Sequence, residues 1–253
     1  MDLKLKLQVY LPLEICTWLN LGEDLSINNG VILWDIDGTL ISTQRHSNIN
    51  LHQKVLEDCG FGIIEPNFET QGVTDWEILN RLLLSIKYRA NHKEMNQILH
   101  ELDSLSEEAD EESIFLPLPG VLNFLKSFKS NFWRLGILTG NTSKRTLAKL
   151  RRADINKYFN TNYIFSCHNK ESRIDIAHRA QRFIKSHEID KVVIIGDTPF
   201  DILIAKEIGA KAVSVATGKF SISELSSFKP DLLIKNLQEY YMEFNDFLNF
   251  NQD

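Results

Sequence analysis

Apolar residues in this chain occur in short unbroken runs that alternate with stretches of helical periodicity. The runs "VILW" at 31–34 and "VVII" at 192–195 contain no alternating polar positions. Unbroken Val- and Ile-rich runs are typical of parallel strands that are buried on both faces. The pattern predicts strands at Val31–Asp37, Trp133–Thr139, Tyr163–Cys167, Val192–Asp197, Ala212–Thr217 and Leu232–Ile234.

Between these runs, apolar residues recur at spacings of three and four. The segment Ser143–Arg152 places Leu147 and Leu150 on one helical face, and Asp201–Ile208 ends before the helix-stopping Gly209. Strands that alternate with helices are typical of a parallel sheet with helices on both faces. We therefore expect an α/β fold with a Rossmann-like, doubly wound parallel sheet.

Residues 42–114 break this alternation. They show no convincing strand, and their periodicity predicts helices at Leu51–Cys59, Thr74–Tyr88 and Lys93–Leu105. The turn sequence "PLPG" at 117–120 marks the return to the alternating pattern. We expect a helical module at 42–114 inserted into a core of residues 30–41 and 115–253, with an N-terminal extension at 1–29.

Composition excludes several classes of protein. The chain has 253 residues, of which 43% are hydrophobic, and a net charge of −6 without a basic cluster, which disfavours binding to a nucleic-acid backbone. Its three cysteines are scattered and form no CxxC pair, so we expect a reducing cytoplasm. No apolar run approaches the roughly 20 residues of a membrane helix. We expect a cytoplasmic monomer or homodimer with neither nucleic-acid nor membrane partners.

Polar side chains stand at the carboxyl ends of three of the predicted strands. Asp35 and Asp37 end the first, Thr139 ends the second and Asp197 ends the fourth. The carboxyl ends of the strands line the ligand crevice in a doubly wound sheet. Asp35 and Asp37 would share a face if their strand stayed regular, and Gly38 permits a sharp turn after them. These residues should therefore lie close together.

Gathered carboxylates repel one another, and burying them is costly unless a cation is present. Mg²⁺ fits best, because it prefers oxygen ligands and keeps sites for water and phosphate, whereas the scattered His and Cys residues disfavour zinc. A phosphoryl group held there can be attacked by one carboxylate to give an aspartyl-phosphate, which water hydrolyses while a second acid exchanges protons. The Thr139 hydroxyl and a lysine would stabilise the phosphoryl charge.

The same residues resemble a known family. The sequences "DIDGTL" at 35–40, "ILTGN" at 137–141, Lys170 before a predicted helix, and "GDTPFDILIAKEIGA" at 196–210 are similar to the four ordered motifs of haloacid dehalogenase (HAD) superfamily phosphohydrolases. The match spans about Val31 to Gly218. The sequences "GVTDWEIL" at 72–79, "PLPGVLNFL" at 117–125 and "TGN" at 139–141 are most similar to the phosphoglycolate phosphatase-like branch.

This resemblance implies a Rossmann-like core, with a helical cap inserted after the first motif, and a role for each motif residue. Asp35 would be the nucleophile and Asp37 the general acid and base. The phosphate would be bound by Thr139, with Gly140 and Asn141 beside it, and its charge stabilised by Lys170. The Mg²⁺ ligands would be Asp35, the backbone carbonyl of Asp37, Asp197 and Asp201, the last directly or through water.

Two assignments have alternatives. The third motif, "CHNKESRIDIAHRA" at 167–180, offers both Lys170 and Arg173 and lacks the proline that follows the lysine in many relatives. Helical spacing to Ile176 and Ala177 favours Lys170. In the insertion, Thr74 and Asp75 would either contact substrate, as the resemblance suggests, or cap the helix that begins near Trp76.

The predicted function is a Mg²⁺-dependent phosphatase that acts on a small phosphorylated metabolite through an aspartyl-phosphate. A phosphoglucomutase-like phosphoryl mutase would share this intermediate and is an alternative. A regulatory protein that keeps the fold without catalysis is another, although all the acids are present. Halide removal is disfavoured, since it needs neither Mg²⁺ nor a second acid such as Asp37.

Overall fold

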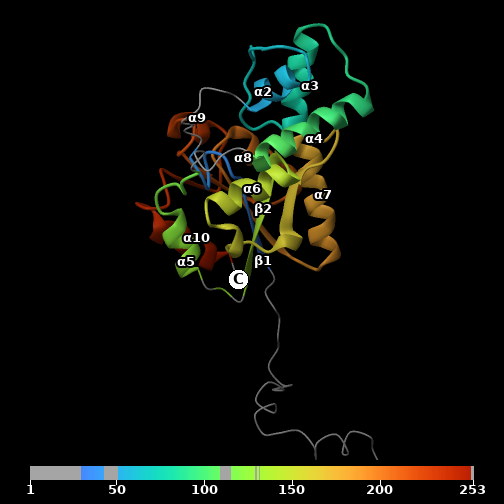
Figure 1. The fold of residues 1–253 in the computed structure, drawn as a ribbon. Coiled ribbons are helices and arrows are strands. Elements are labelled where there is room, and N and C mark those ends of the chain that lie inside the picture. The colour runs from blue at the N-terminus through green and yellow to red at the C-terminus, as the bar shows by residue number, and fades with distance from the viewer. Residues whose placement is uncertain (1–29, 43–50, 109–114, 129, 131, 252–253) are drawn as a thin grey trace, which may run out of the picture.

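The computed structural model describes residues 30–42, 51–108, 115–128, 130 and 132–251 (Figure 1). The predicted N-terminal extension at 1–29 lies outside the described residues. So do the two ends of the predicted insertion, at 43–50 and 109–114.

A six-stranded parallel sheet forms the centre of the described chain, in the order β3-β2-β1-β4-β5-β6. The strands are β1 (Gly30–Trp34), β2 (Trp133–Thr142), β3 (Ile164–Cys167), β4 (Lys191–Gly196), β5 (Lys211–Val215) and β6 (Leu232–Ile234). The predicted doubly wound sheet is confirmed. The strand order reverses between β1 and β4, which is where such sheets bind their ligands.

Helices cover both faces of the sheet, because alternate residues of each strand point to opposite sides. In β1, Ile32 and Trp34 belong to one core cluster, and Val31 and Leu33 belong to the other. The first cluster is shared with α5 (Val121–Ser127), α10 (Tyr241–Phe250) and the end of α6 (Ser143–Arg152). The second is shared with α7 (Arg173–Ser186), α8 (Pro199–Ile208) and α9 (Ile222–Ser227).

Further helices lie between β1 and β2 in the sequence. They are α2 (Leu51–Asp58), α3 (Asp75–Ser85) and α4 (His92–Glu108), and they occupy one end of the molecule in Figure 1. They pack around a separate hydrophobic cluster that includes Leu56, Leu79 and Leu102 and contains no residue of the sheet. The three predicted helices are confirmed, whereas the domain boundaries around them stay a prediction.

The two ends of this helical insertion lie beside each other. The Ser42 amide donates to the carbonyl of Leu116 at 3.0 Å, and the Leu118 amide donates to that of Leu40 at 2.9 Å. The chain therefore leaves the core and returns to it at the same place. The connection between α6 and β3 contains the short 3₁₀ helices η2 (Asn156–Tyr158) and η3 (Thr161–Tyr163).

Some element ends differ from the prediction. β1 ends at Trp34, three residues earlier than expected, because the chain turns after Asp35. The amide of Leu40 bonds to Ile36, and Gly38 has a φ of 83°, a left-handed conformation that favours glycine. Leu147, predicted to face the core, is only half-buried. Within the described residues, no helix is both long and apolar enough to cross a membrane.

Candidate active site

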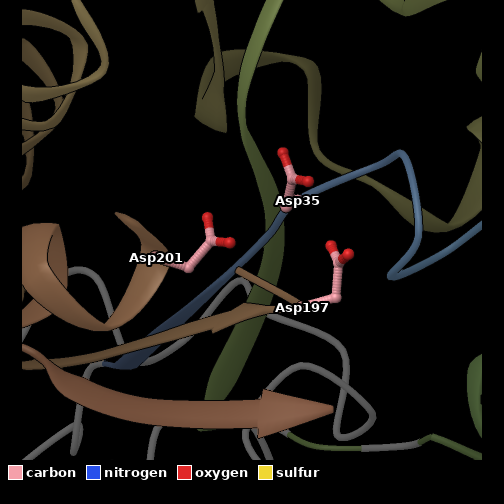
Figure 2. A group of neighbouring side chains, drawn as sticks. All are labelled: Asp35, Asp197 and Asp201. Atoms are coloured by element: carbon pink, nitrogen blue, oxygen red, sulfur yellow. The ribbon is translucent and has the colours of Figure 1, made fainter. Parts of the chain in front are cut away.

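Three buried carboxylates meet at the carboxyl edge of the sheet. Trp34 and Ile195 are partners in the register of β1 and β4, so Asp35 and Asp197, which follow closely after each strand, lie side by side. Asp201 stands in the first turn of α8. Figure 2 shows the three side chains extending to the same side from these separate segments. Each offers a carboxylate oxygen that lies within 4.8 Å of the others.

Glycines make room for the Asp197 carboxylate. A Cβ atom built at Gly38 or at Gly218 would overlap its oxygens. The carboxylate also accepts a hydrogen bond from the Thr39 hydroxyl, with 3.0 Å between Oγ1 and Oδ1. The position of Asp197 thus depends on backbone that approaches closely from two different loops.

The cluster holds excess negative charge. Burial, together with the neighbouring Asp201 and Asp37, raises the pKa of Asp35 to about 6 despite a nearby guanidinium. Burial and the charges of Asp35 and Asp201 also raise the pKa of Asp197 well above its usual range. Like charges in a buried site disfavour ionisation of one another.

Arg173, the first residue of α7, supplies the cation in contact with this cluster. Its Nη1 donates to Oδ1 of Asp35 at 2.8 Å, and its Nη2 contacts Oδ1 of Asp201. Burial opposes the charge of the guanidinium, but Asp35 and Asp201 raise the pKa of Arg173 above its ordinary value. Three carboxylates and one guanidinium leave a formal charge of −2.

This donor set fits a divalent cation that prefers oxygen. It consists of carboxylates without His or Cys, and it is the one potential metal-binding group of at least three side chains among the described residues. A divalent ion would neutralise the remaining formal charge of −2. Mg²⁺ is the small hard cation that typically uses a few carboxylates together with waters and substrate phosphate.

The geometry favours Arg173 over Lys170 for the third motif, contrary to the sequence-based preference. Lys170 is exposed, and its Nζ lies 5.9 Å from the centre of the Trp76 ring. The reason is where the helix begins. Ser172 and Asp175 form a capping box that starts α7 at Arg173 and leaves Lys170 in the preceding loop. The sequence "SRID" contains this capping signal.

Asp37 lies apart from the three converging carboxylates, because β1 ends before it. Its Oδ2 accepts a bond from Nδ2 of Asn141 at 2.8 Å and contacts Nζ of Lys149. Asn141 Nδ2 also donates to the Thr139 hydroxyl at 2.9 Å. Burial alone would raise the pKa of Asp37, but the charges of Lys149 and Arg145 lower it below its usual value. Thr139 and Asn141 are buried at the end of β2.

Lys149 and Arg145 also lie at the site, and no sequence motif predicted them. Both belong to the correctly predicted helix α6, four residues apart, and both are buried. Lysine and arginine are almost never fully buried unless they are paired. The spacing of four residues puts Arg145 and Lys149 on one face of the helix. That spacing was visible in the sequence, but the acids they pair with come from elsewhere in the fold.

Thr74 and Asp75 tie the insertion to the sheet. Thr74 caps α3 through a capping box with Glu77, and its hydroxyl also donates to the carbonyl of Glu171 at 2.8 Å. Asp75 accepts from the backbone amide of Thr142 at 2.8 Å and pairs with Arg145.

The carboxylate of Asp75 is thus used by protein groups on both oxygens. Oδ2 takes the Thr142 amide, while Oδ1 contacts Arg145 and lies 2.8 Å from Nε2 of His52. Burial acts against its charge, but Arg145 and His52 lower the pKa of Asp75. The structure therefore shows the helix cap at Thr74 and an ion pair to the core at Asp75. Substrate contact by either residue stays a prediction.

Comparison with known proteins identifies the family. The family model described as "Haloacid dehalogenase-like hydrolase" matches residues 32–215. The chain belongs to the haloacid dehalogenase-like hydrolases. The matched residues include Asp35, Thr139 and Asp197, and the match confirms the predicted family and the hydrolase class.

Named relatives of this hydrolase include phosphatases. A "Phosphorylated carbohydrates phosphatase" from Thermotoga maritima is 23% identical over 221 residues, covering 82% of this chain and 98% of that protein. The structure of a predicted phosphoglycolate phosphatase from Haemophilus somnus is 16% identical, with a TM-score of 0.61, and covers 85% of this chain and 97% of the other. A provisionally named beta-phosphoglucomutase from Bacteroides vulgatus is 18% identical, with a TM-score of 0.64 and coverages of 89% and 91%. At these identities the two structures show a shared fold.

Proposed function

We propose that this haloacid dehalogenase-like hydrolase is a Mg²⁺-dependent phosphatase that hydrolyses a small phosphorylated metabolite. The observation that carries the proposal is the cluster of Asp35, Asp197 and Asp201, whose carboxylate oxygens lie within 4.8 Å of one another at the strand-order reversal. Such a site can hold a cation and a phosphoryl group together.

In the first step, an oxygen of Asp35 attacks the phosphorus atom. The bond from phosphorus to the leaving oxygen breaks, the leaving oxygen keeps the electron pair, and it takes a proton from the carboxyl form of Asp37. The product is a phosphoryl group bound to Asp35. Thr139 and the backbone amides of Gly140 and Asn141 would bind its oxygens, since phosphoryl transfer is catalysed largely by positioning and charge stabilisation.

In the second step, water attacks the phosphorus atom and the bond to Asp35 breaks, which regenerates the carboxylate. The proton of the water passes to Asp37, so the proton balance closes over the cycle. The cations beside Asp37 lower its pKa and so favour the carboxylate form that accepts this proton. Arg173 stays paired with Asp35 and fills the role that the resemblance gave to Lys170.

The carboxylates of Asp35, Asp197 and Asp201, with the backbone carbonyl of Asp37, would hold Mg²⁺. When bound, the ion supplies electrostatic stabilisation of the phosphoryl oxygens and neutralises the gathered acids. The oxygen-only donor set and its excess negative charge support this assignment.

We further propose a phosphorylated carbohydrate as the substrate class. Support comes from the named activity of the Thermotoga maritima relative, which aligns over 98% of its own length. The insertion, which lies over the end of β2, would select the leaving group. A phosphoryl mutase would form the same intermediate and remains the alternative activity. Analysis of the reaction products separates the phosphatase from the mutase.

The test is a screen of sugar phosphates and other phosphorylated metabolites with the purified protein, with Mg²⁺ or with EDTA, read both as released phosphate and as isomerised product. We expect phosphate release that requires Mg²⁺ and is lost in Asp35→Asn. Isomerised sugar phosphate without net release would favour the mutase. Activity that neither EDTA nor Asp35→Asn reduces would refute the site.

A further inference from the structure

Lys149 is a buried lysine that belongs neither to the carboxylate cluster nor to any motif of the resemblance. It stands in the last turn of α6, and only 5% of its side chain is exposed. Burying an ammonium group is costly unless it is paired and hydrogen-bonded. The buried ammonium group lies beside Asp37, the proposed catalytic acid. Its contacts there must compensate for the cost of burial.

The ammonium group closes a ring of polar contacts. Nζ of Lys149 contacts Oδ2 of Asp37 and donates to Oδ1 of Asn141 at 2.9 Å. The other end of the same amide, Nδ2 of Asn141, donates back to Oδ2 of Asp37 at 2.8 Å. Asp37, Asn141 and Lys149 therefore fix one another, although they come from the turn after β1, the end of β2 and α6.

This ring treats the two oxygens of Asp37 differently. Oδ2 is bound from two directions, whereas no described residue donates to Oδ1. The side chain of Asp37 is 33% exposed, so it would be free to rotate without these contacts. A general acid or base must be held within hydrogen-bonding reach of the atom with which it exchanges a proton.

The neighbour of Lys149 on the same helical face favours this pairing. Arg145 lies one turn earlier and pairs with Asp75, which leaves Asp37 as the carboxylate that pairs with Lys149. Repulsion between the two cations keeps the ammonium group toward Asp37. The buried Arg145 therefore pairs with Asp75, and the buried Lys149 pairs with the partly buried Asp37.

We infer that Lys149 is a positioning residue for the proposed reaction: with Asn141 it holds Asp37 by Oδ2 and leaves Oδ1 to exchange protons with the leaving group and with water. The inference rests on the proposed function, because it assigns a role to Asp37. It adds a residue outside the sequence motifs on which that function was built. Lys149 acts through Asp37 and does not itself touch the substrate.

The experiment is a double-mutant cycle in the full chain with Mg²⁺, using phenyl phosphate and measuring released phosphate. Phenol is a leaving group with a pKa near that of tyrosine, about 10, so its departure depends on a proton. We expect Lys149→Met to lower kcat by about 10- to 100-fold, as misplacement of a catalytic group does, with KM changed less than about threefold. Lys149→Arg should recover part of the loss.

The decisive comparison is between Asp37→Asn and the double variant Asp37→Asn/Lys149→Met. If Lys149 acts through Asp37, the double variant is no slower than Asp37→Asn alone, because coupled residues are not additive. Multiplicative losses would overturn the inference and assign Lys149 a structural role. A raised KM at unchanged kcat would overturn it in favour of direct substrate binding.

Two controls make the outcome unambiguous. Lys144→Met, on the exposed side of the same helix, should leave kcat unchanged, since Lys144 pairs with Glu107 at the surface. Melting curves show whether each variant folds. If Lys149→Met alone does not fold, the double variant, which removes both charges, still decides the question. An inactive wild-type protein, or one unaffected by Asp35→Asn, would instead refute the proposed function and the inference with it.

Discussion

The guanidinium of Arg173 joins two acids of the site, with Nη1 2.8 Å from Oδ1 of Asp35 and Nη2 against Oδ1 of Asp201. A single cation thus orients the proposed nucleophile and a proposed metal ligand at once. Lysine cannot reproduce this arrangement, because its ammonium group lacks the planar fork of the guanidinium.

We therefore predict that Arg173→Met lowers phosphatase kcat by more than about 100-fold, because the nucleophile loses its fixed position and its compensating charge. Arg173→Lys should recover only part of this loss. Lys170→Met is the matched control, and its kcat should change less than about threefold. A larger effect at Lys170 than at Arg173 in steady-state assays would restore the original assignment.

Mg²⁺ should stabilise the protein more at neutral than at acidic pH. The pKa of Asp35 is raised from 3.8 to about 6, so between these values the folded protein without cation binds more protons than the unfolded chain. Its free energy of unfolding must then fall as pH rises through this window. Under the proposed function, Mg²⁺ would bind the deprotonated carboxylates and offset this loss.

The measurement is the increase in Tm on adding Mg²⁺, which should be larger at about pH 7.5 than at about pH 5. Asp197→Asn should reduce the increase at the higher pH. An equal increase at both pH values, or one that survives this substitution, would place the binding of Mg²⁺ elsewhere.

Asp75→Asn should destabilise the fold strongly. Its carboxylate is buried between Arg145 and the Thr142 amide, and breaking a buried ion pair from one side costs about 3–5 kcal/mol. Urea unfolding measures this loss. Glu69→Gln, which removes an exposed pair between the insertion and Lys219, should cost at most about 1 kcal/mol. Similar losses in the two variants would show that the Asp75 pair is not the stronger attachment.

Gly218→Ala should weaken metal-dependent activity without unfolding the protein. A Cβ at this position would overlap the carboxylate of Asp197, a proposed Mg²⁺ ligand, so this side chain must move. We expect the Mg²⁺ concentration for half-maximal activity to rise at least about tenfold. Gly62→Ala is the control, since Gly62 has a φ of 74° but open space around it. It should lose about 1 kcal/mol of stability and no Mg²⁺ affinity.

The fold could be predicted because its signals are local. Strand β6 and helix α6 have the bounds that their patterns predicted, and the parallel sheet then brings Asp35 and Asp197 together as expected. The turn around Gly38 ends β1 at Trp34, earlier than predicted, so Asp37 lies apart from that cluster.

The rest of the site depends on tertiary contacts. The choice between Lys170 and Arg173 depends on where α7 begins, a shift of a few residues that periodicity does not resolve. The partners of Lys149 and Asp75 follow from how the turn after β1 and the insertion lie against α6, which no single segment of sequence encodes.

The paired backbone at residues 40–42 and 116–118 places the two chain connections between the helical insertion and the core side by side. A segment attached in this way can be lengthened, shortened or exchanged without altering the register of any strand. Under the proposed function, evolution could then vary the choice of leaving group in one part of the gene while the proposed catalytic acids are inherited unchanged in another.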